Sequence, residues 1–267
     1  MTVSTYPRQG WISLVAKSIS MPSLWMMMAW QDVRQRYRGS LLGPFWITGS
    51  LAATSLGIGL LYSNILGADP KSFVPFVTAG LVVWTLISLT VIEGCGAFLS
   101  AASLLRNSSL PIYIHVFRAV ARNLVVLAHN LLVLIAVFLY FRVVPTPAML
   151  LAIPGLLLLV ANLTWIVFVV AALSARFRDI PQVVTYVMQF AIFITPVFWT
   201  PQSLNHGHKV VLLGNPFYHM LDVVRGPLLG TLPTSATWWF LSGMLAFGLV
   251  LSSVVAANFG RKIVFWV

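Results

Sequence analysis

Three arginines separated by single residues precede the first long apolar stretch of the chain. Arg34, Arg36 and Arg38 are followed by 30 residues, from Gly39 to Ala68, without a charged side chain. A guanidinium group suits phosphate oxygens because it presents a planar fork of donors. Bases beside a membrane span also favour the cytoplasmic side and lie at the depth of lipid headgroups. We expect an anionic, lipid-linked substrate to be met here, with a purely topological role of the arginines as the alternative.

The arginines belong to a predicted amphipathic helix over residues 23–38. One face of this helix carries, at helical spacing, Met26, Trp30, Val33 and Tyr37. Arg34 and Arg36 lie roughly 80° to either side of that face. This arrangement is typical of a helix that rests in the membrane interface with its bases directed outward. Asp32 and Arg36, at positions i and i+4, are predicted to pair.

Glu93 is the acid that falls inside a predicted span. An acidic residue within a membrane segment is a candidate for function, because its burial in hydrocarbon is costly. The flanking sequence EGCG favours close helix contact instead, and Glu93 lies near the cytoplasmic end of its span. A structural role and a transport role both remain open at this stage.

Patterns for other kinds of chemistry are missing from the sequence. It contains no GxxxxGK[ST], HExxH or GxSxG motif and no pair of catalytic carboxylates. Cys95 is the single cysteine, and His206 and His208 alone supply too few ligands for a metal. Asp222 and Arg225, at i and i+3, are predicted to form a local pair on an amphipathic outer helix. We therefore predict no catalytic residue, no metal site and no cofactor in this chain.

Composition places the chain among polytopic membrane proteins. Of its 267 residues, 59% are hydrophobic and only 8% are charged, and the mean hydropathy is +0.93. The net charge of +11 reflects only five acids. The bases are spread between apolar runs, which favours anionic lipid over nucleic acid as a partner.

The apolar runs predict six membrane-spanning helices in one domain over residues 1–267. Their expected ranges are 42–66, 73–100, 122–141, 148–174, 181–199 and 235–258. The link 103–115 is predicted to be a short helix broken before Pro111, either a plain loop or a contact for a soluble partner. Residues 200–233 are too broken by proline and glycine to span. Twelve bases on the side of both termini, against four on the other side, predict cytoplasmic termini.

Aromatic side chains are dense in the fifth predicted span. Tyr186, Phe190 and Phe193 lie at i, i+4 and i+7 and form one helical stripe, followed by Phe198 and Trp199 at the exit. Such a stripe is typical of packing or lipid contact. The alternative is a pore wall on which sugar rings stack.

Five motifs, in order along most of the chain, resemble the permease subunits of ABC exporters for O-antigen and related cell-surface polysaccharides, a group of type-2 ABC permeases. The motifs are RYRGSLLGPFW (36–46), LPIYIHVFRAVARNLVVLAHN (110–130), RFRDIPQVV (176–184), ITPVFW (194–199) and NPFYHMLDVVRGPLLG (215–230). One departure is the absence of a proline just after Trp46, where the chain reads Ile47-Thr48-Gly49-Ser50. A kink at that position is therefore not expected.

The resemblance implies an all-α homodimer in the bacterial inner membrane, docked on two separate ATPase subunits that bind ATP and Mg. Residues 1–40 would contain an interfacial gate helix, and residues 200–233 would form short external re-entrant helices. Residues 103–115 would be the coupling helix. Its candidate contacts with the ATPase are Leu105, Arg106, Asn107, Ser108, Leu110 and Pro111.

The implied cargo is a polysaccharide carried on undecaprenyl diphosphate, exported through a channel lined by the first and fifth spans. The candidates for meeting the diphosphate are Arg34, Arg36, Tyr37 and Arg38. The channel-lining candidates are Trp46, Tyr186, Phe190, Phe193, Phe198 and Trp199. Alternatives are export of teichoic acid, capsule or another lipid-linked cargo, and a membrane-embedded glycan transferase, against which the lack of an acid constellation argues.

Overall fold

The computed structural model describes residues 11–41, 43, 45–108, 110–201 and 212–267, and these residues form helices and connecting segments without a strand. This confirms the all-α class. The elements in chain order are α1 (Trp11–Ile19), α2 (Pro22–Arg36), α3 (Phe45–Leu66), α4 (Pro70–Gly94), η1 (Leu99–Ala101), α5 (Ala102–Asn107), α6 (Tyr113–Tyr140), η2 (Pro147–Leu151), α7 (Ala152–Arg176), α8 (Ile180–Ile194), α10 (Pro216–Leu228) and α11 (Ser235–Trp266).

Five helices of the described residues are long and apolar enough to cross a membrane. They are α3, α4, α6, η2 with α7, and α11. The expected fifth span is shorter than predicted, because α8 ends at Ile194 after 15 residues. A helix of that length rises about 22 Å, against roughly 30 Å of hydrocarbon. The chain is thus a multi-pass membrane protein.

Two helix boundaries differ from those expected near the first polar link. Helix α4 ends at Gly94 rather than near residue 100, and α6 begins at Tyr113, nine residues before the expected start at residue 122. Two bases, Arg118 and Arg122, interrupt the apolar pattern in the first turns of α6. They continue the helix because their charges are neutralised by partners on α2 and α4.

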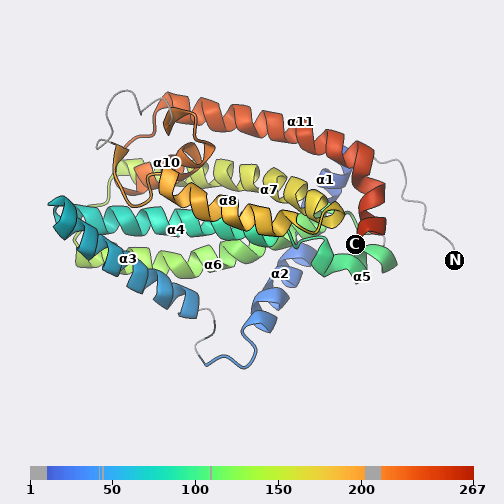
Figure 1. Ribbon diagram of the computed structural model, residues 1–267, viewed down its shortest axis with the longest axis horizontal. Coiled ribbons are helices and arrows are strands. Elements are labelled where there is room, and N and C mark those ends of the chain that lie inside the picture. Colours follow the sequence, from blue (N-terminus) through green and yellow to red (C-terminus); the bar gives the residue numbers. More distant parts are fainter. Residues whose placement is uncertain (1–10, 42, 44, 109, 202–211) are drawn as a thin grey trace.

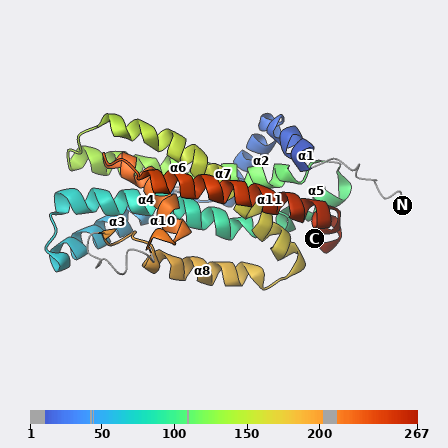
Figure 2. The same ribbon diagram turned by 90° about the horizontal axis from the view of Figure 1, so that it is seen from above.

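The long helices run side by side, and α4 lies at the centre of the bundle (Figures 1 and 2). It packs against α3, α6, α7, α8 and α10. Its most apolar stretch is 72% buried within the chain, against 22% for α3 and 17% for α11. The outer faces of α3 and α11 are therefore left for lipid or for another protein chain.

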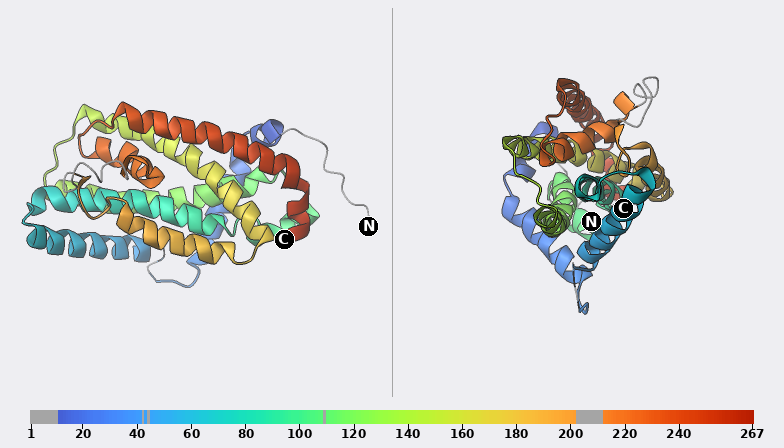
Figure 3. Two further views of the ribbon diagram at one scale, coloured as in Figure 1. Left: turned by 45° about the horizontal axis from the view of Figure 1, so that its top comes forward. Right: turned by 90° about the vertical axis from the view of Figure 1, so that its left-hand side faces the viewer.

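The two ends of the bundle differ. Helices α1 and α5, the α7–α8 turn and the last turns of α11 gather at one end, which we call the α5 end (Figures 1 and 3). The α3–α4 turn and α10 lie toward the opposite end. There Asp69 caps α4, its carboxylate accepting from the backbone N–H of Lys71 at 3.0 Å, and Asn215 caps α10 in the same way at Phe217.

Arg225 is not on an outer helix, and this prediction was wrong. Helix α10 packs against α4, α7 and α11, and Arg225 is only 3% exposed. Its guanidinium lies 4.2 Å from the centroid of the Phe76 ring on α4 and donates to the carbonyl oxygen of Pro196. The cation thus ties α10 to α4 and to the exit of α8, while Asp222 lies beyond ion-pair distance and accepts from Thr237 at 3.5 Å.

Glycines permit two of the closest helix contacts. At Gly94 a Cβ would lie 2.8 Å from a methyl carbon of Val167 on α7, which agrees with the close contact expected from the EGCG sequence. At Gly155 on α7 a Cβ would overlap the backbone carbonyl of Val223 on α10. A backbone group cannot turn aside as a side chain can, so α7 and α10 would have to separate.

We therefore expect Gly155→Ala to lower the free energy of unfolding by about 1–3 kcal/mol, the usual cost of overpacking. Thermal melting of the detergent-purified protein measures this effect. Gly243→Ala is the matched control, because a Cβ there meets nothing within 4 Å. Equal melting temperatures for the two variants would contradict the close contact between α7 and α10.

Candidate functional site

Helix α2 leans across α6 at the α5 end and runs obliquely away from the bundle (Figure 1). Its buried residues are Ala29 and Val33, and Trp25 contacts the ring of Phe117 on α6, with centroids 5.8 Å apart. Met26 and Trp30, expected on the same face as Val33, are 56% and 59% exposed. The apolar surface of α2 is thus divided, with one part packed on α6 and the other directed away from the chain.

Asp32 on α2 is held by two arginines of α6. The guanidinium of Arg118 donates to both carboxylate oxygens, with Nε 2.7 Å from Oδ2. Nη1 of Arg122 lies 3.3 Å from the same Oδ2. A bidentate guanidinium–carboxylate pair combines charge with fixed geometry. This contact sets the position of α2 along α6.

Glu93 on α4 completes the cluster from the other side. Its Oε1 lies 2.6 Å from Nη1 of Arg36, and its Oε2 lies 2.8 Å from Nη2 of Arg122. The side-chain amide of Asn123 donates to Oε2 at 3.2 Å. Arg122 therefore bridges both carboxylates, and we call the connected residues the ionic cluster: Asp32, Arg36, Glu93, Arg118 and Arg122.

The predicted local pair between Asp32 and Arg36 does not form. Both side chains find partners on other helices, where Arg118 and Arg122 offer Asp32 two guanidinium groups and Glu93 offers Arg36 a carboxylate. A pair at i and i+4 on an exposed helix surface contributes only about 0.3–0.5 kcal/mol. Partly buried contacts between helices outcompete it.

Two members of the ionic cluster on α2, Asp32 and Arg36, are held in their charged forms by their partners. Burial raises the pKa of the Asp32 carboxyl, but the hydrogen bond and charge of Arg118, followed by those of Arg122, hold that pKa below its ordinary value. The hydrogen bond to Glu93 raises the pKa of Arg36. A lowered carboxyl pKa stabilises the fold above the ordinary carboxyl pKa, and this contribution is lost as pH falls through the lowered value.

Of the three arginines predicted to meet the substrate, Arg36 forms an ion pair within the described residues. Arg34 and Arg38 are exposed and have no ion pair with any residue that the structure describes. Tyr37 is half-buried at the end of α2, and its Cβ lies 3.9 Å from the position of a Cβ on Gly43. Gly43 thus lies close to Tyr37, and the neighbouring Arg38 is exposed.

The aromatic candidates lie on two helices that both pack on α4. Trp46 on α3 is 63% exposed, and the stripe on α8, formed by Tyr186, Phe190 and Phe193, is 60–69% exposed. Phe198 and Trp199 follow α8 and are half-buried, with Nε1 of Trp199 3.2 Å from the carbonyl oxygen of Phe193. Among these rings, Phe193 lines a hollow between α8 and α4, together with Trp84 and Ser88.

The link between α4 and α6 forms the predicted short helix. Helix α5 ends at Asn107, and the chain is extended at Ser108, before Pro111. Leu105 is buried, whereas Arg106 and Asn107 are exposed, and the Arg106 guanidinium contacts the backbone oxygen of Val267 at the end of α11. Ser108 and Leu110 are half-buried and Pro111 is buried. The exposed side of α5 is available for a partner, and its buried side is anchored in the core.

The sequence interpretation missed Arg118 and Arg122 as site residues. Both precede or begin the expected third span at residue 122, in a stretch whose bases indicate only which side of the membrane it faces. Their spacing carried a signal, because His115, Arg118 and Arg122 recur at i, i+3 and i+7 and so share one face of a helix. No cluster of metal-ligating side chains occurs within the described part of the chain, and His206 and His208 lie outside it.

We expect Glu93→Ala to lower the free energy of unfolding by about 3 kcal/mol, because it leaves Arg36 without a carboxylate and leaves Arg122 with Asp32 as its only carboxylate partner among the described residues. Arg122→Ala should also destabilise the fold, and the double variant should cost less than the sum. Chemical unfolding in detergent measures all three. Arg34→Ala is the control and should leave stability unchanged; additive effects of Glu93 and Arg122 would contradict the contact.

The family model described as "ABC-2 type transporter" matches residues 23–229, from the first turn of α2 to the end of α10. A relative described as "O-antigen export system permease protein RfbA", from Myxococcus xanthus, is 24% identical over 213 residues, which cover 79% of this chain and 82% of the relative. The matched region contains the whole ionic cluster.

Proposed function

Because the chain belongs to the ABC-2 type transporter family, whose members are membrane-embedded transport subunits, we propose that it exports a lipid-linked polysaccharide of the O-antigen type. The observation that carries this proposal is the match over residues 23–229, supported by the relative described as an O-antigen export permease. Permeases of this family generally pair with ATPase subunits. In this account the protein lies in the bacterial inner membrane and is a transport subunit, not an enzyme.

The ATPase partners supply the energy. The sequence has no P-loop of its own, so ATP and Mg would bind to two separate ATPase chains. Helix α5 is suited to receive their movement, because Leu104, Arg106 and Asn107 are exposed while Leu105 is 2% exposed in the core. A displacement of α5 by the ATPase would be transmitted to α6, since only a short link separates the two helices.

The channel belongs to a dimer of two copies. Helices α3 and α8 expose apolar and aromatic side chains that a single chain leaves uncovered. In a dimer these faces would enclose a passage, with Trp46, Tyr186, Phe190 and Phe193 available to stack on sugar rings. Helix α8 with Thr195–Trp199 would complete a fifth crossing, α11 a sixth, and the buried α10 would be a re-entrant element.

The cytoplasmic entrance lies at the α5 end. The bias of basic residues in the sequence supports cytoplasmic termini, and the α5 end also carries the exposed Arg34. A diphosphate needs cationic partners that apolar spans cannot provide. We assign direct contact with the diphosphate to Arg34 and Arg38. Arg36 has a positioning role, because its guanidinium is held by Glu93 at 2.6 Å and so fixes α2 against α4.

A strain that lacks this chain should lose surface polysaccharide of the O-antigen type, and the wild-type gene should restore it. Leu104→Asp, which places a charge on the exposed side of α5, should neither restore export nor retain the ATPase on co-purification. Leu232→Asp is the control, because Leu232 is 70% exposed on the α10–α11 link and lies away from α5. Normal export in the deletion strain would overturn the proposed function, whereas a purified chain that modifies lipid-linked sugar without an ATPase would favour a transferase.

Arg38→Gln should reduce export without lowering the melting temperature, because the side chain has no ion pair with described residues. Arg36→Gln should lower the melting temperature, because it removes a partner of Glu93. Arg38→Lys tests whether the contact with the diphosphate needs the planar fork of donors or only a positive charge, since lysine retains the charge but loses the fork. Wild-type export by Arg38→Gln would show that Arg38 does not contact the substrate and contributes only to the orientation of the chain in the membrane.

A further inference from the structure

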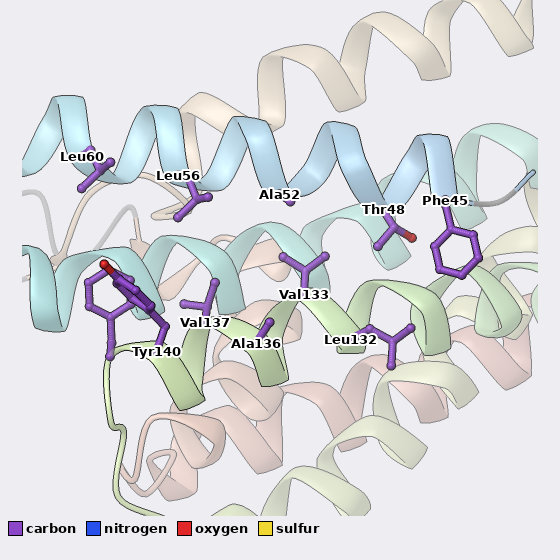
Figure 4. Close-up of a pocket in the computed structure, with 11 residues that line it drawn as sticks. Phe45, Thr48, Ala52, Leu56, Leu60, Leu132, Val133, Ala136, Val137 and Tyr140 are labelled. Carbon is purple, nitrogen blue, oxygen red and sulfur yellow. The ribbon is translucent and has the colours of Figure 1, made fainter. Parts of the chain in front are cut away.

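A groove of about 720 Å³ runs between α3 and α6 (Figure 4). Figure 4 shows Phe45, Thr48 and Ala52 on the side of α3 that faces α6, with Ala136 on the opposite wall. Nearly all lining side chains are apolar, and the small residues Ala52 and Ala136 leave space between the helices. The volume falls in the range typical of small-molecule binding sites.

The dimensions of the groove fit a single hydrocarbon chain. Its wall on α3 extends from Phe45 to Leu60, a rise of about 22 Å. An extended hydrocarbon chain would lie lengthwise in this space and contact the apolar side chains of both helices.

The Phe45 end of the groove is the end nearer to a cation along the chain. Thr48 lines the groove one turn from Phe45, but it is only 8% exposed and its hydroxyl oxygen is buried, without a hydrogen-bond partner among the described residues. Arg38 adjoins Tyr37, Gly43 precedes Phe45 by two residues, and the Cβ of Tyr37 lies 3.9 Å from the position of a Cβ on Gly43. This contact brings the residue next to Arg38 toward the chain that enters the Phe45 end of the groove, and a basic side chain there suits a phosphate headgroup.

We propose that the groove between α3 and α6 binds the hydrocarbon tail of the polyprenyl carrier, with its phosphate at Arg38. This inference rests on the proposed function and names a binding site for the lipid part of the cargo. The tail would remain on the lipid-facing side of α3 while the glycan is transported elsewhere. Binding of the tail there would place the diphosphate at the entrance and so select the carrier from bulk lipid.

The test uses the purified full-length protein and native mass spectrometry with undecaprenyl phosphate as the probe. Undecaprenol, which lacks the phosphate, and phosphatidylglycerol, which has acyl tails, are the comparators. The wild type should retain undecaprenyl phosphate best. Ala136→Trp, which fills the groove, should reduce its retention by roughly tenfold, the effect of expelling about two methylene groups from an apolar site.

Leu139→Trp is the matched control, because Leu139 lies on the same helix, is 74% exposed and is not part of the groove. Ala52→Leu provides a milder filling variant if Ala136→Trp lowers the melting temperature. Arg38→Gln should weaken binding of undecaprenyl phosphate but not of undecaprenol. Equal retention of phosphatidylglycerol, or wild-type retention by both filling variants, would overturn the inference.

The failure of this inference can be separated from failure of the proposed function. If Ala136→Trp loses undecaprenyl phosphate yet supports export at the wild-type rate, the groove is not a substrate site and the exporter assignment stands. If the deletion strain exports normally, the exporter assignment fails whatever the groove binds. Reduced export by Ala136→Trp, with normal export by Leu139→Trp, supports both.

Discussion

The ionic cluster is the constraint on which the arrangement at the α5 end depends. Three arginines on α2 and α6 share two partly buried carboxylates, Asp32 on α2 and Glu93 on α4. Three positive and two negative charges leave a net charge of +1. Charges in this position are costly to bury unless each is paired. The helices can therefore not shift independently, because any displacement would leave a charge without its partner.

The cluster also decides what the neighbouring arginines can do. By holding Asp32 and Arg36 toward α6 and α4, it leaves Arg34 exposed on α2 and Arg38 exposed just after the helix ends. Glu93, an acid inside a span, acts here as the anchor of α2. Its cost in hydrocarbon is offset by two guanidinium groups and an amide, which favours the structural interpretation of this residue over a direct role in transport.

A second buried cation organises the opposite end. Arg225 contacts an aromatic ring and a backbone carbonyl instead of a carboxylate, and it holds together α10, α4 and the chain that leaves α8. The two ends are thus fixed by different contacts, an ion-pair network near α5 and a desolvated guanidinium at the other end. Between them the helices pack through apolar side chains and glycines, and the outer faces of α3, α8 and α11 stay open to lipid or a second copy.

The sequence by itself determined the class of protein, the apolar helices, the short helix before Pro111 and the family resemblance, because these follow from local composition and from motifs in order. It also identified the arginine segment before α3 as a place of interest. Only the tertiary structure decided which arginine is engaged, since the partners of Asp32, Arg36 and Glu93 are up to 90 residues away and local spacing favoured the wrong pair. The same holds for the buried Arg225 and for the α3–α6 groove, because burial and cavities arise from how helices pack and not from the pattern along any one of them.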